Sequence, residues 1–445
     1  MPQINKTRPH IVVPSRDLAV LRAAITAFFA LDGFIFAGWV VRVPDIKRQT
    51  HASAGTLGLA LLCVSAGAVL TMTLTGRLCA RYGSHRVTVG WMAVLAPSVA
   101  LPPLTHSATA LGGVLLLFGS AYGGVNVAFN SAAVDLVAAL RRPVMPSFHA
   151  AFSLGGMAGA GLGGLVAGSL SPRQHLLGLT LVGLTVTAVA GRALLRYEAP
   201  VPAERLRPGP AGGAVRPEPG GGAARAGSTG RAEQPGPQGG TARPGSEGDA
   251  ARPEAVSSAA RSRRRKRRLV VVFGLIALCD AYGEGAMADW GALHLRQDLA
   301  ASSGVAAAGY AGFAFTMTVG RLSGTRLLER LGRARTVIAG GATAAAGMLL
   351  GSLATSLWLA LAGFAVAGLG LSNIFPVAIE RAGALAGPSG VAVASTLGYG
   401  GMLFGPPAIG FAADRFSLST ALTSVAVLAA AAAVTGVFTR RSLGS

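Results

Sequence analysis

Long apolar stretches, interrupted by short polar segments, are the dominant pattern along this chain. A helix needs roughly 20 consecutive, mostly apolar residues to cross the hydrocarbon core of a bilayer. We expect such helices near residues 20–41, 54–76, 87–105, 108–136, 148–170, 174–194, 269–292, 304–325, 335–355, 357–379, 390–413 and 417–439. The pattern therefore predicts an all-α membrane protein with twelve transmembrane helices.

The composition supports the same class. Of the 445 residues, 51% are hydrophobic and 13% are charged, whereas about a quarter are charged in soluble domains. A polar, basic leader precedes the first apolar stretch, so we expect that helix to be retained rather than removed with a signal peptide. The three cysteines fall within or just past predicted spans, and their odd number implies no disulfide framework.

The formal net charge of +21 could indicate nucleic-acid binding, so the placement of the basic residues has to decide its meaning. With both termini inside, the inner loops carry Arg77, Arg81, Arg86, Arg141, Arg142, Arg321, Arg326, Arg330, Arg333, Arg335 and Arg381. The outer loops carry only Arg42, Lys47, Arg48, Arg173, Arg296 and Arg415. This asymmetry is the positive-inside bias. We therefore expect a cytoplasmic (inner) membrane protein, with both termini cytoplasmic and no nucleic-acid partner.

Residues 196–268 separate two groups of six predicted helices. The segment is rich in Pro, Gly, Ala and Arg and has almost no large apolar residue after Leu206. Such a composition buries too little surface to offset chain entropy. We therefore predict an N-terminal half at 1–195, a disordered basic cytoplasmic linker at 196–268 and a C-terminal half at 269–445.

Four pairs of sequence markers recur at nearly one offset. The segments Arg81–Arg86 (RYGSHR) and Arg330–Arg335 (RLGRAR) both fit R-x-G-x-x-R and lie 249 residues apart. The other pairs, at offsets of 248, 247 and 245, are Asp32 with Asp280, Asn126 with Asn373, and Gly156-Met157 with Gly401-Met402. Their agreement indicates two duplicated halves of six helices.

These halves and loops resemble the major facilitator superfamily, which is built from two such repeats. The family's loop after the second span reads roughly G-x-x-x-D-R-x-G-R-R; Gly76, Arg81 and Gly83 match it, while Ala80 replaces the acid. Residues 148–156 (FHAAFSLGG) and 38–47 (GWVVRVPDIK) resemble the fucose-permease-related branch of bacterial facilitators. The resemblance implies the two-half facilitator fold and proton-coupled movement of a sugar or similar polar solute.

Acidic residues inside predicted spans are candidates for proton coupling, because a charge at mid-membrane is costly and therefore usually functional. Asp32 lies at the centre of the first span, among phenylalanines. It is either a proton carrier or a carboxyl satisfied by hydrogen bonds to another helix. In the seventh span, Asp280 and Glu284 are four residues apart and share one helical face, where two acids favour binding of one proton.

Amides and tyrosines within the spans are the substrate-binding candidates. They are Asn126, Asn130, Asn373, Tyr122 and Tyr282. Amides suit hydroxylated ligands because they both donate and accept hydrogen bonds, but they also hold transmembrane helices together. Both roles remain open for these residues.

Residues near the cytoplasmic ends of spans are the gating candidates. They are Gly76, Arg81, Gly83, Arg86, Arg330, Gly332, Arg335, Asp135 and Glu380. Asp135 and Glu380 are close in sequence to Arg141 and Arg381, so each forms a gate salt bridge or takes part in proton coupling. His149 opens the fifth span and either titrates near neutral pH or is a hydrogen-bonded structural residue.

The sequence contains no Walker motif, metal-ligand cluster or convincing nucleophile elbow, so we expect no enzyme, cofactor or metal site. The expected partners are a small-molecule substrate, protons and the lipid bilayer, and we expect a monomer. Three functions stay open: a proton-coupled importer of a polar solute, an exporter of drugs or metabolites on the same fold, and a membrane receptor or assembly factor without transport.

Overall fold

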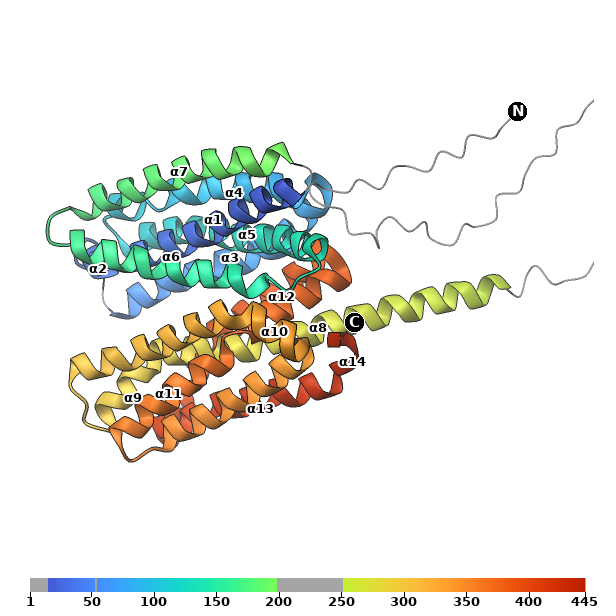
Figure 1. Ribbon diagram of the computed structural model, residues 1–445. Helices are drawn as coiled ribbons and strands as arrows, with labels where there is room; N and C mark the ends of the chain where they lie inside the picture. Colours follow the sequence, from blue (N-terminus) through green and yellow to red (C-terminus); the bar gives the residue numbers. More distant parts are fainter. Residues whose placement is uncertain (1–14, 53, 198–250, 445) are drawn as a thin grey trace, which may run out of the picture. The chain divides into compact units, whose positions relative to one another are not determined.

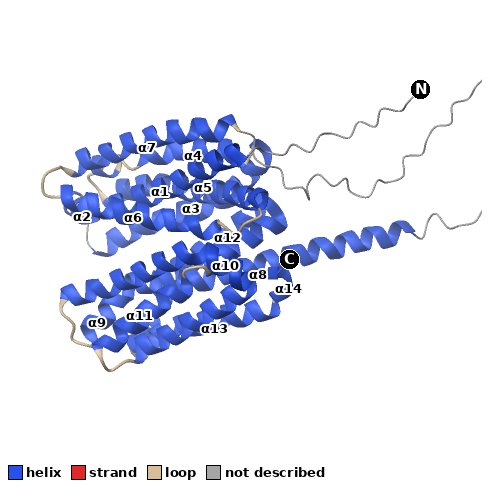
Figure 2. Ribbon diagram, viewed as in Figure 1, coloured by secondary structure: helices blue, strands red, loops and turns tan. Residues whose placement is uncertain are grey.

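A computed structural model of the chain describes residues 15–52, 54–197 and 251–444. Within these ranges the regular structure is entirely helical (Figure 2). The first half contains α1 (Ser15–Val40), α2 (Val43–Gln49), α3 (Ala54–Tyr82), α4 (Ser84–Ser98), a 3₁₀ turn (Pro102–Leu104), α5 (Ala108–Leu140), α6 (Met145–Val166) and α7 (Pro172–Arg196). The second contains α8 (Ala251–Ala286), a π turn (Met287–Gly291), α9 (Ala292–Gln297), α10 (Ser303–Leu353), α11 (Leu357–Leu371), α12 (Ile374–Arg415), α13 (Leu418–Phe438) and α14 (Arg440–Gly444) (Figure 1).

Two of the long helices each contain a break that separates two membrane crossings. In α10 the break is at Gly332, with φ 77° and ψ 162°, and in α12 it is at Ala386 and Gly387. Gly332 and its counterpart Gly83, with φ 88°, adopt backbone conformations that are readily accessible only to glycine. Among the described residues nine helical stretches are long and apolar enough to cross a membrane. The two breaks divide two of these stretches, with α11 and the first part of α12 forming one crossing, and α6 adds a helix of 22 residues. Together they give the predicted twelve crossings, and the all-α prediction is confirmed.

The helix of the seventh crossing begins before the predicted apolar span. Helix α8 starts at Ala251, whereas the expected start was residue 269 and residues 196–268 were expected to be disordered. The segment 251–268 is rich in alanine and arginine, which have high helix propensity, so the helix extends beyond the apolar stretch. The rest of the predicted linker, residues 198–250, lies outside the described residues.

Each half packs its helices closely through small residues. Helix α1 packs on α6 and α7, and α3 and α4 pack on α5, while α10 packs on α11 and α13 in the second half. A Cβ on Gly155 of α6 would lie 1.9 Å from the Ala30 carbonyl oxygen of α1. A Cβ on Gly401 of α12 would lie 2.3 Å from the Leu278 oxygen of α8. Close packing through small residues is therefore repeated in the two halves.

The two halves contact each other where α12 meets α3 and α5, and where α10 meets α6. A Cβ on Gly76 would lie 2.7 Å from the Ala392 Cβ, and a Cβ on Gly383 would lie 2.8 Å from a Val134 methyl. These positions lie toward the end of the bundle that carries the loops at Gly83 and Gly332, which we call the arginine-rich end. The halves are in close contact at this end.

Candidate functional site

Arg321 on α10 links the two halves through its guanidinium group. Its Nη2 donates to Glu284 Oε1 on α8 at 2.7 Å, and its Nη1 donates to Ser153 Oγ on α6 at 2.8 Å. Its Nε donates to the Ser372 carbonyl oxygen at 3.3 Å. Arg321 is only 6% exposed, so these bonds form away from solvent. A single buried cation therefore contacts an acid in its own half and a hydroxyl in the other.

Two acids on α8 lie next to this cation. Glu284 pairs directly with Arg321, and its side chain is 25% exposed. Asp280, one helical turn earlier, is 1% exposed and interacts electrostatically with both Glu284 and Arg321. With both acids ionised the cluster would carry one excess negative charge, which a single proton neutralises.

Asp32 is the third buried acid and comes from the first half. It is fully buried on α1, among Phe28 and Phe29, and neither carboxylate oxygen has a hydrogen-bond partner in the described part of the chain. Its carboxyl interacts electrostatically with Tyr122 on α5 and Tyr399 on α12. The interhelical hydrogen bonds that a purely structural role would supply are not present among these residues.

His149 of α6 lies between aromatic rings of the two halves. Its ring centroid is 5.3 Å from that of Phe29 and 5.7 Å from that of Phe375 on α12. The residue is 7% exposed, and its Nε2 has no hydrogen-bond partner in the described residues. His149 is also one turn from Ser153, whose hydroxyl donates to the His149 carbonyl and accepts from Arg321. The imidazole therefore has a free polar atom beside the Arg321 cluster.

The two tyrosine candidates have different surroundings in the structure. Tyr122 meets Tyr399 across the two halves, with ring centroids 6.3 Å apart in an edge-to-face arrangement. Tyr282, in contrast, forms a 2.8 Å hydrogen bond with Ser424 of α13 within the second half. Tyr122 therefore lies with Asp32 at the junction, whereas Tyr282 is committed to packing in its own half.

The amide candidates do not gather around the acids. Asn130 Nδ2 donates to the Asn126 carbonyl oxygen at 2.8 Å, which is a bond within one turn of α5. Asn373 Nδ2 donates to the Gly320 carbonyl oxygen and to Ser372 Oγ, both at 2.9 Å. The bond from Asn373 joins two helices and favours the alternative in which an amide holds helices together, whereas the bond from Asn130 stays within α5.

At the arginine-rich end, a salt bridge between the halves joins two residues that were not among the gating candidates. Arg142, after α5, contacts Glu329 of α10 at 2.8 Å. Glu380 pairs with Arg333, whose Nε lies 2.8 Å from Glu380 Oε1, whereas Arg381 donates to the Ser442 carbonyl. Glu380 therefore forms a salt bridge between helices with Arg333, and it also interacts electrostatically with its neighbour Arg381.

The remaining gate candidates are distributed over the same end. Asp135 is 8% exposed and interacts electrostatically with Cys79. Arg81 lies over the ring of Tyr82 at 5.2 Å from its centroid, and Arg86, Arg330 and Arg335 are exposed.

Arg321 is the main residue that the sequence analysis misplaced. The charge pattern places it among the basic residues of the inner loops, but it lies inside α10 and is buried. The sequence does indicate its importance, because residue 321 falls within the expected span 304–325, where a charged residue usually has a functional role. No comparable signal identifies Ser153, because a serine in a glycine-rich span is ordinary.

Comparisons with known proteins place this arrangement in context. The sequence model of the Major Facilitator Superfamily matches residues 23–283. An uncharacterized MFS-type transporter of Yersinia pestis is 32% identical over 406 residues, covering 90% of this chain and 91% of the relative. An uncharacterized transporter, y4wD, of Sinorhizobium fredii is 30% identical and covers 92% and 96%. The solved structure of the facilitator FucP in an outward conformation has a TM-score of 0.67 at 14% identity, over 95% of this chain and 99% of FucP.

Proposed function

Because this chain belongs to the major facilitator superfamily of membrane transporters, we propose that it carries a small polar solute across the cytoplasmic membrane together with protons. The observation that carries the proposal is the buried Arg321 cluster, in which Glu284 of one half and Ser153 of the other share one guanidinium. Alternating access needs a site at the junction of the halves whose contacts change when the halves move. The Arg321 cluster meets that requirement.

In the proposed mechanism, the acids bind and release protons as the halves rearrange. A carboxylate buried without a counter-charge is costly, which makes Asp32 a candidate proton carrier because no hydrogen-bond partner for it is present among the described residues. A proton on Glu284 would weaken its bond with Arg321, and Asp280 beside it offers a second site. Proton binding is thereby linked to the contact that joins Arg321 to Ser153.

The groups around the cluster favour a hydroxylated solute. Among the described residues His149 Nε2 has no hydrogen-bond partner, and the side chains of Tyr122, Tyr399 and Phe375 present aromatic surfaces from both halves. Hydroxyl groups of a sugar-like molecule can bond to the imidazole, while the apolar faces of its ring pack on the aromatic side chains. These features support the sugar-like class.

The contacts between the halves support a state that is closed at the arginine-rich end. The Arg142–Glu329 salt bridge and the close approach of Gly76 to Ala392 both lie there. We place this end at the cytoplasmic face on the positive-inside rule, with both chain termini on the same side. The structure then corresponds to an outward-facing state, and the Arg142–Glu329 contact breaks when the protein opens inward.

Proteoliposomes that contain a pH-sensitive dye test the proposal. Neutral monosaccharides and polyols are added outside, and solute entry with protons acidifies the lumen. We expect acidification with the wild-type protein and none with Asp32→Asn or Glu284→Gln. Asp414→Asn is the matched control, because this acid is exposed at the end of α12 and should leave acidification unchanged. Unchanged acidification in both site variants would refute the proton-coupling assignment. Absence of solute movement with any member of the panel would refute the sugar-like class.

A further inference from the structure

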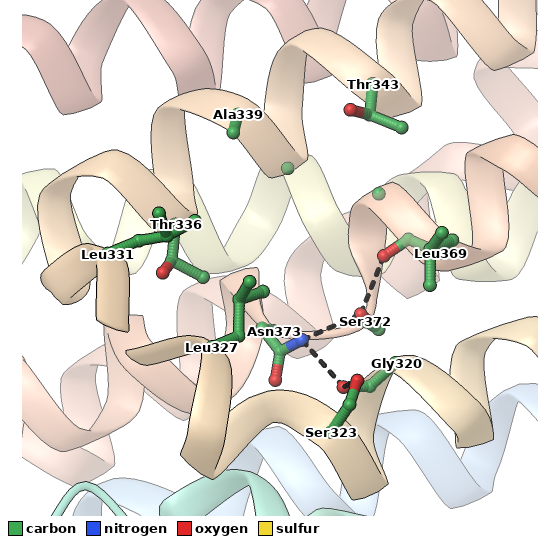
Figure 3. A pocket seen from close by; sticks show the side chains of 12 residues that line it. Gly320, Ser323, Leu327, Leu331, Thr336, Ala339, Thr343, Leu369, Ser372 and Asn373 are labelled. Atoms are coloured by element: carbon green, nitrogen blue, oxygen red, sulfur yellow. Dashed lines mark hydrogen bonds between the residues drawn. The ribbon is translucent and has the colours of Figure 1, made fainter. Parts of the chain in front are cut away.

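A cavity of about 290 Å³ is lined by residues of the second half. Two segments of α10, on either side of its break at Gly332, form most of the wall, together with the end of α11 and the start of α12 (Figure 3). Leu327, Leu331, Ala339 and Leu369 supply much of its apolar lining. Thr343 and Asn373 add polar atoms.

The cavity is open on the side that faces the bilayer. Ala339 and Leu369 are exposed within membrane-crossing stretches, whereas Leu327 and Leu331 are exposed on the last turns of α10 before its break at Gly332. Apolar side chains exposed at this depth contact lipid rather than water. The natural occupant of an apolar crevice in this position is therefore an acyl chain.

Arginines neighbour several lining residues in sequence, near the arginine-rich end of α10. Arg326, Arg330 and Arg335 directly neighbour the lining residues Leu327, Leu331 and Thr336 in sequence. All three arginines are exposed, and none is paired with a carboxylate among the residues that the structure describes. Unpaired arginines at the membrane interface attract anionic head groups.

We propose that this crevice is a binding site for an anionic phospholipid, whose acyl chain fills the cavity and whose phosphate contacts Arg330 and its neighbours. The proposal goes beyond transport and does not depend on the identity of the solute. It assigns a ligand to the arginines of the second R-x-G-x-x-R loop, of which only Arg333 has an acidic partner in the structure.

The site shares a wall with the Arg321 cluster. Ser372 and Gly320 line the cavity, and the Ser372 carbonyl accepts a hydrogen bond from Arg321 Nε. Asn373 donates to the Gly320 carbonyl and so ties the lining of α12 to α10. A bound acyl chain would therefore support the backbone that positions Arg321.

Native mass spectrometry of the full-length protein tests the proposal. The protein is released from nanodiscs that contain equal amounts of phosphatidylglycerol and phosphatidylcholine with identical acyl chains. We expect preferential retention of phosphatidylglycerol by the wild type. The double variant Arg326→Gln/Arg330→Gln removes two head-group contacts. It should weaken the preference for phosphatidylglycerol by roughly 10- to 30-fold. The control Arg192→Gln/Arg196→Gln removes equal charge from exposed positions at the end of α7 and should retain the preference.

A second pair of variants tests the acyl-chain cavity itself. Ala339→Phe places a ring in the crevice and should abolish retention of the lipid, whereas Ala346→Phe, on an exposed position of the same helix outside the lining, should not. Competition with millimolar inorganic phosphate shows whether the site recognises a lipid or a free anion. A site for phosphate alone would lose the lipid to the added phosphate, whereas a site that also holds the acyl chain should keep it. Equal retention of the two lipids by the wild type, or full retention by Ala339→Phe, would overturn the proposal.

Discussion

Replacing Arg321 with glutamine removes a buried cation that joins the two halves. The variant loses a charge-assisted bond of 2.7 Å to Glu284 and a bond of 2.8 Å to Ser153. Breaking a fully buried ion pair by removing one partner costs about 3–5 kcal/mol. Because the Glu284 side chain is 25% exposed, solvent reduces this cost, and we expect about 2–3 kcal/mol for Arg321→Gln.

The Glu284→Gln variant leaves the cation in place and should cost less. Arg321 keeps its bonds to Ser153 and to the Ser372 carbonyl, and a glutamine can still accept one hydrogen bond. We expect about 1–2 kcal/mol. The double variant should be more stable than the sum of the single effects predicts, by about 1–2 kcal/mol, because the pair is then removed as a unit.

Unfolding by sodium dodecyl sulfate in mixed micelles, followed by fluorescence of the four tryptophans, measures this cycle. The control cycle uses Asp414→Asn and Arg415→Gln, which are adjacent exposed charges at the end of α12 and should have additive, near-zero effects. Additivity of the Arg321 and Glu284 effects to within about 0.5 kcal/mol would show that the two side chains do not form an energetically coupled pair.

Three further predictions follow from other contacts. Gly324→Ala places a Cβ 2.0 Å from Asn373 Oδ1 and 2.6 Å from the Pro146 Cβ, so it should open the arginine-rich end. Buried Cys79, which lies at that end, should then react faster with water-soluble maleimides. Arg42→Ala removes a 1% exposed guanidinium that donates to three carbonyls near the end of α6, and should cost about 3–5 kcal/mol in the same unfolding assay. Burial opposes ionisation of Asp45, but hydrogen bonds from two arginines outweigh it and hold the pKa of Asp45 below its ordinary value. Its stabilising contribution is therefore complete at neutral pH and lost as the pH falls through the lowered pKa, and Asp45→Asn should remove that part of the pH dependence of unfolding.

The repeated halves could be predicted from the sequence because each marker depends on local chemistry. Gly83 and Gly332 break helices at equivalent loops, since both adopt a positive φ that other residues avoid. Asp32 and Asp280 recur because a charge within an apolar span stands out in any hydropathy pattern. The helix ends were less predictable, as α8 shows, because helix propensity continues past the last apolar residue.

By itself, the sequence determined the class of this protein, its twelve crossings, its duplicated halves and the acids buried within them. Apolar length and isolated charges are local properties, so they can be read along the chain. Only the tertiary structure decided which residues meet: Arg321 pairs with Glu284 and Ser153, Glu380 with Arg333, and Arg142 with Glu329. These partners lie from 37 to 187 positions apart and are brought together by packing between helices, which no local pattern along the chain specifies.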